Sequence, residues 1–336
     1  MTLLKKLGAT AAALVLSSGL AMAQGKVTLA IGGASCLCYL PTMLAQQLDM
    51  YKKHGVTVDV VQFKGGSEGL KAVLGGSADV VSGYYDHTVE LAPKGQNLQA
   101  FVVYDRYPGL ALVVSPKHTG EIKSVKDLAN KKIGVSAPGS STDFFLKYLA
   151  RKNGVDANSI GVIGVGLGAT AVAAMEQGQI DAAVMLDPAI TILQGKYKDL
   201  RILSDTRSQK DTLAVFGGDY PGGALYTKRD WIEAHPKEVQ GMTDAIVDTL
   251  QWIQSHSPEE ITAKMPPEFT KDKQLYIAAL KNTLPMYSKT GLMDPKGAQA
   301  VKDVFSAANP AVAKVDLSTT YTNKFAEQAD KKLGVK

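Results

Sequence analysis

The chain has 336 residues, of which 45% are hydrophobic and 21% are charged, and its formal net charge at pH 7 is +5. The basic residues are not gathered in runs, which argues against a nucleic-acid-binding protein, and the length is sufficient for two domains with cores of their own. Only two cysteines are present, so the chain is not a disulfide-rich scaffold.

The N-terminus has the pattern of a secretory signal peptide. Two lysines precede an apolar run over residues 7–20, and Ala21 and Ala23 form a small-x-small cleavage site. The apolar run is too short to span a bilayer, and no cysteine lies at the cleavage point to carry a lipid anchor. We therefore expect residues 1–23 to be removed and the mature protein to be located in the periplasm.

Strands and helices alternate from residue 26 onwards. The first series predicts strands at 27–31, 56–63, 80–82 and 98–104. Pro41 at a first helical position and Gly55 after the last turn mark the two ends of the first intervening helix. Such alternation indicates a mostly parallel sheet that is covered by helices on both faces.

A second series follows in a similar order. It predicts strands at 109–115, 132–135, 160–165, 181–186, 200–203, 213–216 and 224–227. We expect the first of these to cross into a second lobe and the last to cross back. Four helices then follow, at 236–255, 271–284, 295–307 and 320–333, and Thr270, Asp294 and Thr319 are predicted to cap the last three.

The two series contain the same helix–glycine–strand unit. Gly76 and Asp79 in the first are matched at the same spacing by Gly178 and Asp181 in the second. This repeat predicts two related α/β lobes that face each other across one cleft. We assign residues 24–110 and 225–336 to lobe I and residues 111–224 to lobe II.

The candidate ligand-binding residues lie in loops that follow strands, because ligands of open α/β sheets bind beyond the carboxyl ends of the strands. Five loops meet this description: 35–39, 64–67, 82–87, 137–142 and 166–170. Four of them lead into helix starts, whose free N–H groups and positive dipole end suit a carboxylate, sulfonate or phosphate. We expect the ligand to contact Ser35, Cys36, Tyr39, Gly66, Ser67, Ser82, Tyr84, Tyr85, Arg106, Ser140, Ser141, Thr142, Gly168, Thr170 and Asp187.

Several of these residues have a second interpretation. The Ser, Thr and Gly residues are also ordinary helix caps, and the three tyrosines are also suited to packing beneath helices. Arg106 precedes the crossing and would either pair with an anion or lie solvated at the hinge. If Asp86, Asp143 or Asp187 faces the ligand, a zwitterion or an amine-bearing solute is favoured over a bare anion.

Two weaker patterns indicate other functions. Cys36 and Cys38, with His87, would hold Cu(I) or zinc, although small buried thiols are the alternative interpretation. Cysteines two residues apart are too close for an unstrained bridge on an extended chain. Gly164-x-Gly166-x-x-Ala169 fits a loosened dinucleotide fingerprint, but it does not lie in a first βα turn.

Known catalytic motifs are otherwise missing from the sequence. It contains no nucleophile elbow, no phosphate loop and no His-Glu-x-x-His zinc motif. We therefore expect neither an enzyme nor a bound cofactor or metal. A secreted interaction module without a small ligand is a further alternative.

Six stretches of the mature chain carry a resemblance to a known family. They are Tyr39-Leu-Pro-Thr-Met-Leu-Ala-Gln-Gln-Leu-Asp-Met-Tyr-Lys-Lys-His-Gly-Val-Thr-Val-Asp, Gly75-Gly-Ser-Ala-Asp, Val125-Lys-Asp-Leu-Ala-Asn-Lys-Lys-Ile-Gly-Val-Ser, Gly178-Gln-Ile-Asp-Ala-Ala-Val, Asp187-Pro and His235-Pro-Lys-Glu-Val. With these stretches the chain resembles the nitrate/sulfonate/taurine-type solute-binding proteins of ABC importers. The family also includes binders of thiamine pyrimidine precursors. Related eukaryotic pyrimidine synthases carry a cysteine-rich motif, of which this chain has only Cys36-Leu-Cys38.

The resemblance implies a two-lobed periplasmic-binding-protein fold of type II, with parallel-dominated sheets flanked by helices and a ligand cleft between the lobes. It places the ligand loops at 35–39, 65–67, 82–85 and 140–142. We expect a monomer that captures a small anionic or zwitterionic organic solute, such as a sulfonate, a taurine-like solute or a carboxylate. The lobes would close about hinges near 106–115 and 217–226, and the protein would deliver the solute to an ABC permease in the inner membrane.

Two alternatives stay open at this point. One is a binder of a thiamine pyrimidine precursor, and the other is an enzyme that uses Cys36, Cys38 and His87.

Overall fold

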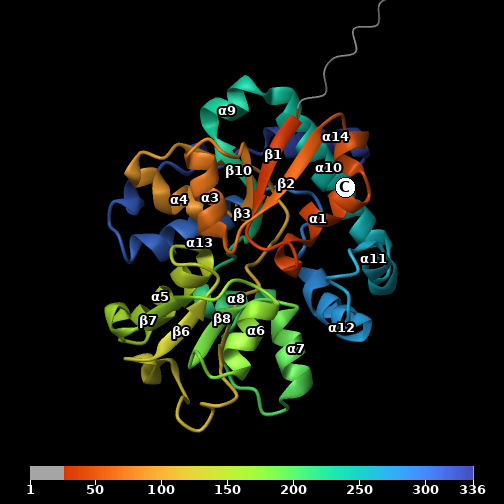
Figure 1. Cartoon of the computed structure of the whole chain (residues 1–336). Helices are drawn as coiled ribbons and strands as arrows, with labels where there is room; N and C mark the ends of the chain where they lie inside the picture. The colour runs from red at the N-terminus through yellow and green to blue at the C-terminus, as the bar shows by residue number, and fades with distance from the viewer. Residues whose placement is uncertain (1–25, 336) are drawn as a thin grey trace, which may run out of the picture.

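Two five-stranded sheets, each flanked by helices, make up the chain (Figure 1). The structure, a computed structural model, describes residues 26–335, and the predicted signal peptide lies outside them. Within residues 26–335, no helix is both long and apolar enough to cross a membrane. The alternating α/β pattern predicted from the sequence is therefore present in both halves of the molecule.

The first sheet belongs to lobe I and has the strand order β2-β1-β3-β10-β4. Its strands are β1 (Lys26–Ile31), β2 (Thr57–Gln62), β3 (Val80–Tyr84), β4 (Leu98–Val103) and β10 (Gly223–Lys228). β1 pairs in parallel with β2 and β3, while β10 is antiparallel to both β3 and β4. Four strands thus point the same way, and the strand that returns from the other lobe runs against them.

The second sheet belongs to lobe II and has the order β7-β6-β8-β5-β9. Its strands are β5 (Ala111–Val114), β6 (Lys132–Val135), β7 (Gly161–Gly164), β8 (Ala182–Met185) and β9 (Ile202–Asp205). β6 is parallel to β7 and β8, and β5 is antiparallel to β8 and β9. The two sheets therefore share one topology, in which the crossing strand β5 takes the place that β10 has in lobe I.

The repeated aspartates explain why both halves fold alike. The Asp79 carboxylate accepts a 2.7 Å hydrogen bond from the backbone N–H of Thr28, and Asp181 accepts one of 2.6 Å from Lys132. Gly76 and Gly178, which end the preceding helices, have φ of +77° and +69°, a conformation that favours glycine. Each unit thus ends a helix and fixes the strand that follows it, β3 beside β1 in lobe I and β8 beside β6 in lobe II.

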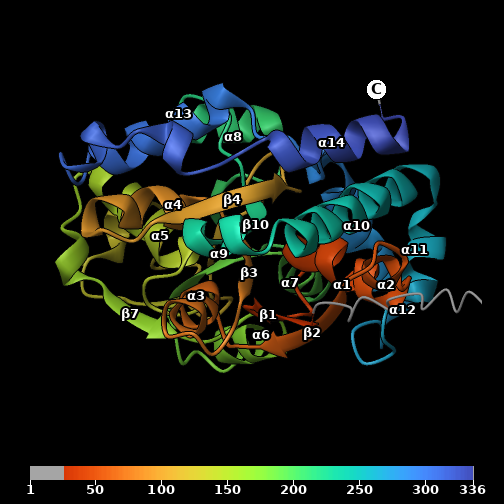
Figure 2. The same cartoon turned by 90° about the horizontal axis from the view of Figure 1, so that it is seen from above.

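Helices cover the sheets of both lobes (Figures 1 and 2). Lobe I carries α1 (Leu40–Gln47), α2 (Met50–Lys53), α3 (Gly66–Leu74), α4 (Asp86–Leu91), α9 (Arg229–Ala234), α10 (Pro236–Ser255), α11 (Pro258–Lys264), α12 (Lys273–Thr283), α13 (Pro295–Ser306) and α14 (Lys324–Leu333). Lobe II carries α5 (Ser141–Lys152), α6 (Ala169–Glu176), α7 (Ala189–Lys196) and α8 (Gln209–Phe216). α10 packs against α1, α2 and α14, as expected for C-terminal helices that return to lobe I, while α12 contacts α7 of lobe II.

Some predicted elements were wrong. Residues 213–216, predicted as a strand, belong to α8, because the Ser208 hydroxyl accepts from the N–H of Asp211 and starts a helix there. A short apolar run does not by itself distinguish strand from helix. Asp294 caps α13 as predicted, but the cap of α12 is Asp272 rather than Thr270, and the residue before α14 is Asn323 rather than Thr319.

Candidate ligand-binding cleft

Loops from both lobes enclose a small inner cavity of about 20 Å³. Its lining is Cys38, Tyr39, Gly66, Tyr84, His87, Leu110, Ser136, Ser140, Ser141, Thr142, Leu167 and Leu186. The set combines residues from loops 35–39 and 82–87 of lobe I with residues from loop 137–142 of lobe II. The strand ends of the two lobes therefore share one hollow, as the repeat predicts.

Direct hydrogen bonds cross this cleft. The Ser67 N–H donates to Ser140 Oγ at 3.0 Å, and Ser67 Oγ donates to the carbonyl of Pro138 at 3.0 Å. Ser141 Oγ donates to Asp86 Oδ1 at 2.7 Å. All the side chains in these bonds are buried, so the lobes are closed on each other in this structure.

Glycine allows the loops to approach so closely. A Cβ on Gly65 would lie 2.8 Å from Ala137 Cβ and 3.0 Å from its backbone nitrogen, which is closer than side chains pack. A Cβ on Gly168 would lie 2.8 Å from Ser35 Oγ. Both contacts join one lobe to the other, so these glycines set how tightly the cleft closes.

Two helices of different lobes begin at the inner cavity. Gly66 is the first residue of α3, and Ser141 is the first residue of α5. The first N–H groups of a helix have no partner within the helix, and the dipole makes this end positive. The cavity therefore lies between two helix ends that both favour a negatively charged or strongly polar group.

Two buried carboxyl groups lie in the same region. Burial raises the pKa of Asp86, against the opposing effects of His87 and of the hydroxyls of Ser141 and Tyr220. Burial also raises the pKa of Asp105 well above its ordinary value, and the only opposing effect is the Gly223 N–H, which donates to Oδ2 at 3.0 Å. Among the described residues, no hydrogen-bond partner reaches Asp105 Oδ1.

Tyrosines form the lobe I side of the cavity. Tyr39 and Tyr84 line it, and the Tyr84 hydroxyl donates to the carbonyl of Pro108 at 2.5 Å. Burial raises the pKa of Tyr39, and the nearby carboxylates of Asp105 and Asp86 add to this effect. Both tyrosines are therefore neutral hydroxyl groups that can donate or accept a hydrogen bond.

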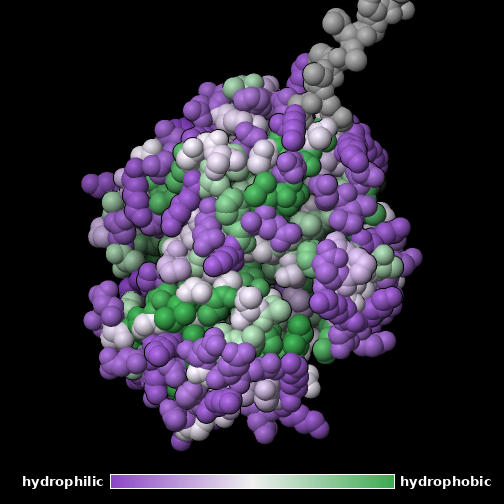
Figure 3. All heavy atoms as spheres, in the orientation of Figure 1, coloured by the Kyte–Doolittle hydropathy of each residue, from purple (hydrophilic) through white to green (hydrophobic). Residues whose placement is uncertain are grey.

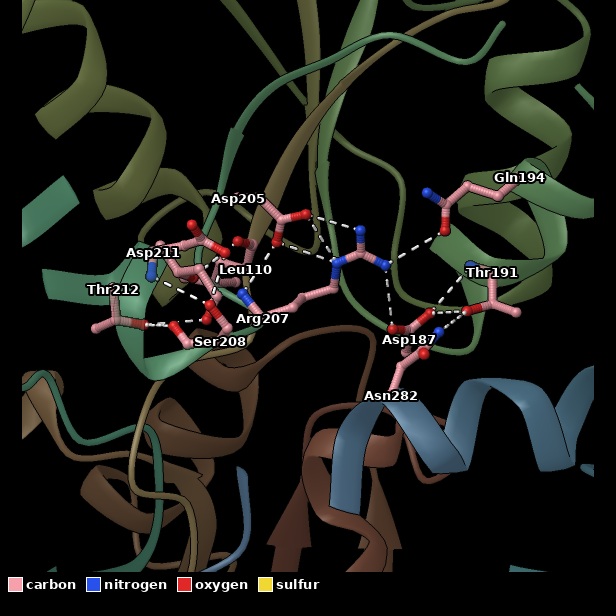
Figure 4. Close-up of polar contacts among 11 residues, drawn as sticks. Leu110, Asp187, Thr191, Gln194, Asp205, Arg207, Ser208, Asp211, Thr212 and Asn282 are labelled. Atoms are coloured by element: carbon pink, nitrogen blue, oxygen red, sulfur yellow. Dashed lines mark hydrogen bonds and ion pairs between the residues drawn. The ribbon is translucent and has the colours of Figure 1, made fainter. Parts of the chain in front are cut away.

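Arg207 holds a polar network at the edge of the cleft (Figure 4). Its guanidinium contacts Asp205 Oδ2 at 2.7 Å and Asp187 Oδ2 at 3.4 Å. Asp187 Oδ1 in turn accepts from the N–H and the hydroxyl of Thr191 at the start of α7. Asp187 lies near the cleft as predicted, but its carboxylate is occupied by this network.

The structure brings many of the predicted residues together. Tyr39, Gly66, Tyr84, Ser140, Ser141 and Thr142 line the inner cavity. Ser67 bonds across the cleft to Ser140. Ser82 does not line the cavity, and its hydroxyl contacts Thr42 and Tyr104 at 2.7 Å each inside lobe I.

Ser35 and Gly168 lie further out, in a cavity of about 600 Å³. Helices α6 and α7 of lobe II and α12 of lobe I provide most of its walls, including Val172, Ile192 and Leu275. Figure 3 shows apolar side chains gathered along the junction of the two lobes on the face viewed. This outer cavity adjoins loops 35–39 and 166–170.

Three predicted residues lie elsewhere. Tyr85 follows the last residue of β3 with the backbone angles of a helix, and its hydroxyl contacts Thr320 Oγ1 at 2.6 Å inside lobe I. Arg106 is exposed and donates to Gln209, and Thr170 is exposed and donates to the carbonyl of Val165 within its own loop. These three side chains contribute to neither cavity just described.

Cys36 and Cys38 are joined by a disulfide bond, which corrects the expectation of free buried thiols. The chain is not extended there: a 3-10 turn begins at Leu37 and leaves the two Cα atoms 5.2 Å apart, within the range for a bridge. His87 Nδ1 lies 2.8 Å from the Tyr226 hydroxyl. Within residues 26–335, no three His, Cys, Asp or Glu side chains are grouped so that they could hold a metal ion.

The sequence prediction did not single out Arg207 or Asp105. Arg207 follows β9, which extends two residues beyond the strand predicted at 200–203, so the loop that carries it was not recognised. Asp105 follows β4 and has no distinctive motif around it. The available signal was an acid directly after the predicted strand at 98–104 and a base four residues after the one at 200–203.

Comparison with known proteins identifies a matching family and a relative of known structure. The model of the NMT1-like family matches residues 22–265. A protein of known structure from Bordetella bronchiseptica RB50 is 38% identical, covers 92% of this chain and 98% of its own, and superposes with a TM-score of 0.90.

Two more distant relatives have described ligands. The alkanesulfonate-binding protein SsuA from Xanthomonas axonopodis pv. citri is 18% identical over 89% of this chain and 98% of its own, with a TM-score of 0.69. The nitrate/nitrite binding protein NrtA of Nostoc sp. is 23% identical over 245 residues, or 67% of this chain, and the match spans only about half (53%) of that protein. The resemblance and the fold class predicted from the sequence are thus confirmed.

Proposed function

The chain belongs to the NMT1-like family, and on this premise we propose that it is the periplasmic solute-binding protein of an ABC importer. It captures a small organic solute between its two lobes and presents the closed complex to a permease in the inner membrane. The predicted signal peptide supports export, and the protein acts as a monomer because each chain forms a whole cleft of its own.

The observation that carries this proposal is the cavity shared by the two helix starts at Gly66 and Ser141. A solute held there contacts both lobes only when they are closed. Its binding free energy therefore favours the closed state over the open one, which is how a ligand shifts such an equilibrium. The inner cavity of about 20 Å³ has room for little more than a water molecule, so the lobes open to admit an organic solute and then close on it around a wider cavity than in this structure.

The polar groups at the cleft favour a zwitterion or a small acid such as a sulfonate, a taurine-like compound or a carboxylate. Within the described chain, no lysine or arginine lines the inner cavity, so its anion-binding groups are N–H groups and hydroxyls. Asp86 is joined to the inner cavity by its hydrogen bond from Ser141, which lines that cavity. Its carboxylate would accept an ammonium group of the solute. A taurine-like solute, with an acidic and an amino end, uses both kinds of group.

An enzyme that uses Cys36, Cys38 and His87 receives no support from the described contacts. The two sulfur atoms are bonded to each other, and both ring nitrogens of His87 lie beside protein oxygens of Tyr226 and Gly139. We therefore propose binding and release of the solute without a chemical step.

The test is a thermal-shift screen of the mature protein with taurine, alkanesulfonates, dicarboxylates, nitrate and a pyrimidine, followed by calorimetry on each hit. We expect a zwitterionic or anionic organic solute to raise the melting temperature and to bind with one-to-one stoichiometry. A shift with the pyrimidine alone would replace the solute class proposed here. No shift with any compound would contradict the proposal.

A further inference from the structure

A second cavity lies between the lobes, on the other side of the Asp86–Ser141 bond. Its volume is about 210 Å³, and it is bounded by α4 and α13 of lobe I and by α5 and α8 of lobe II. Figures 1 and 2 show these four helices on the same side of the molecule. We call this cavity the aromatic chamber.

Six aromatic side chains line the chamber: Phe144, Phe145, Tyr148, Phe216, Tyr220 and Phe305. Phe216 and Tyr220 stack with ring centroids 4.1 Å apart, and Phe144 meets Phe305 edge to face at 5.2 Å. Rings that are held in fixed positions by one another offer both faces and edges to a further ring. Because a cavity of about 150 Å³ is sufficient to bind benzene, this one has room for a substituted ring.

The charges around the chamber are paired, with one exception. Glu90 pairs with Lys94 at 2.5 Å, and Lys147 pairs with Asp143 at 2.8 Å. Asp86 accepts from Ser141 and Tyr220. Arg151 lies in the last turn of α5, is exposed and lines the chamber, and its guanidinium has no ion-pair or hydrogen-bond partner among the described residues.

We propose that the aromatic chamber is a second binding site, which takes a small aromatic carboxylate with its ring among Phe144, Phe216 and Tyr220 and its carboxylate on Arg151. The guanidinium supplies two parallel N–H donors that match a carboxylate, and no protein carboxylate competes for them. The chamber shares only Leu110 and Ser141 with the inner cavity. Its occupancy is therefore tested separately from the solute-binding function proposed above.

Isothermal titration calorimetry of the mature protein with benzoate tests this site. Benzoate is expected to bind, while benzyl alcohol, which lacks the charge, and cyclohexanecarboxylate, which lacks the aromatic ring, bind more weakly. Arg151→Gln is expected to weaken benzoate binding by about tenfold, since a charge-assisted pair is lost. Phe216→Leu, at a partly exposed position, is expected to weaken it by about fivefold.

Two control variants locate the site. Lys126→Gln removes the same charge from an exposed position of lobe II that does not line the chamber, and it is expected to change affinity by less than about twofold. Tyr39→Phe alters the inner cavity alone and is likewise expected to leave benzoate affinity unchanged.

Absence of benzoate binding would overturn the proposal, and so would binding that is insensitive to Arg151→Gln. Binding that responds to Tyr39→Phe but not to Arg151→Gln would place benzoate in the inner cavity. That result would reject the chamber as a site and leave the solute-binding function standing.

Discussion

The Asp86 carboxylate at the start of α4 accepts a 2.7 Å hydrogen bond from the hydroxyl of Ser141 at the start of α5. One residue belongs to lobe I and the other to lobe II, and both are buried. The other carboxylate oxygen of Asp86 accepts from Tyr220 at 3.3 Å. This buried acid therefore joins the lobes at the boundary between the inner cavity and the aromatic chamber.

Ser141→Ala tests this link. The change removes the hydroxyl that donates to Oδ1 of a buried carboxyl group, so we expect the free energy of unfolding to fall by about 1–3 kcal/mol. Urea denaturation followed by circular dichroism measures it. Ser77→Ala removes an exposed hydroxyl that bonds within its own turn, and it is expected to change stability by less than about 0.5 kcal/mol. Equal losses in the free energy of unfolding for the two variants would show that the Ser141–Asp86 hydrogen bond does not stabilise the protein.

Gly65→Val tests how tightly the loops close. A side chain here meets Ala137 of the other lobe, and relief of such overlap costs about 1–3 kcal/mol. We expect the lobes to stay apart more of the time, so that the Ser67 amide, which donates to Ser140, exchanges its hydrogen faster.

The matched control for this substitution is Gly120→Val, because a Cβ on Gly120 meets nothing within 4 Å and its φ is not positive. Hydrogen–deuterium exchange of peptides covering 64–67 and 137–142 is the measurement. Unchanged exchange in Gly65→Val, relative to this control, would show that the two loops do not limit closure.

Asp105→Asn tests the buried acid behind the tyrosines. Burial raises the pKa of Asp105 well above 3.8, so the folded protein holds this proton more tightly than the unfolded chain does. Its contribution to stability is therefore lost as the pH rises from about 3.8 through the raised pKa. The side-chain amide introduced by Asp105→Asn does not ionise, so the variant does not lose stability in this way. Its amide oxygen still accepts from the Gly223 N–H.

We expect the melting temperature of Asp105→Asn, relative to wild type, to increase from pH 5 to pH 8. Differential scanning calorimetry at several pH values gives this difference. A difference that is flat or falls with pH would contradict the assignment of the raised pKa to Asp105.

Arg207→Gln tests the network at the cleft edge. The substitution leaves Asp187, which is buried, without its cation, and we expect a loss of about 3–5 kcal/mol in the free energy of unfolding. Arg106→Gln removes an exposed guanidinium whose described partner is Gln209, and it is expected to cost less than about 0.5 kcal/mol. Chemical denaturation of both variants decides whether the network stabilises lobe II.

Much of the fold follows from local sequence patterns. The glycine and aspartate pairs at 76/79 and 178/181 predicted two equivalent lobes, because each glycine ends a helix and each carboxylate holds two strands together. The strand at 213–216 was mispredicted since four apolar residues suit either structure, and the Ser208 cap was the signal that favoured a helix.

The site was predicted at the level of loops but not of side chains. Tyr84 and Tyr85 are adjacent in sequence, yet only Tyr84 faces the cavity, and the strand pattern does not show which face is inside when both are apolar. The Cys36–Cys38 bridge depends on a tight turn that spacing alone does not reveal. The contact of Arg207 with Asp187 depends on the position of β9 beside β5, which is a tertiary feature.

Small-angle X-ray scattering of the mature protein, with and without the solute found by the thermal-shift screen, tests the central claim that one solute closes two lobes over a shared cavity. We predict that the solute decreases the radius of gyration of the wild-type protein and of Gly120→Val, and that the decrease is smaller in Gly65→Val. A solute that binds at one-to-one stoichiometry without any compaction of the wild-type protein would contradict the account.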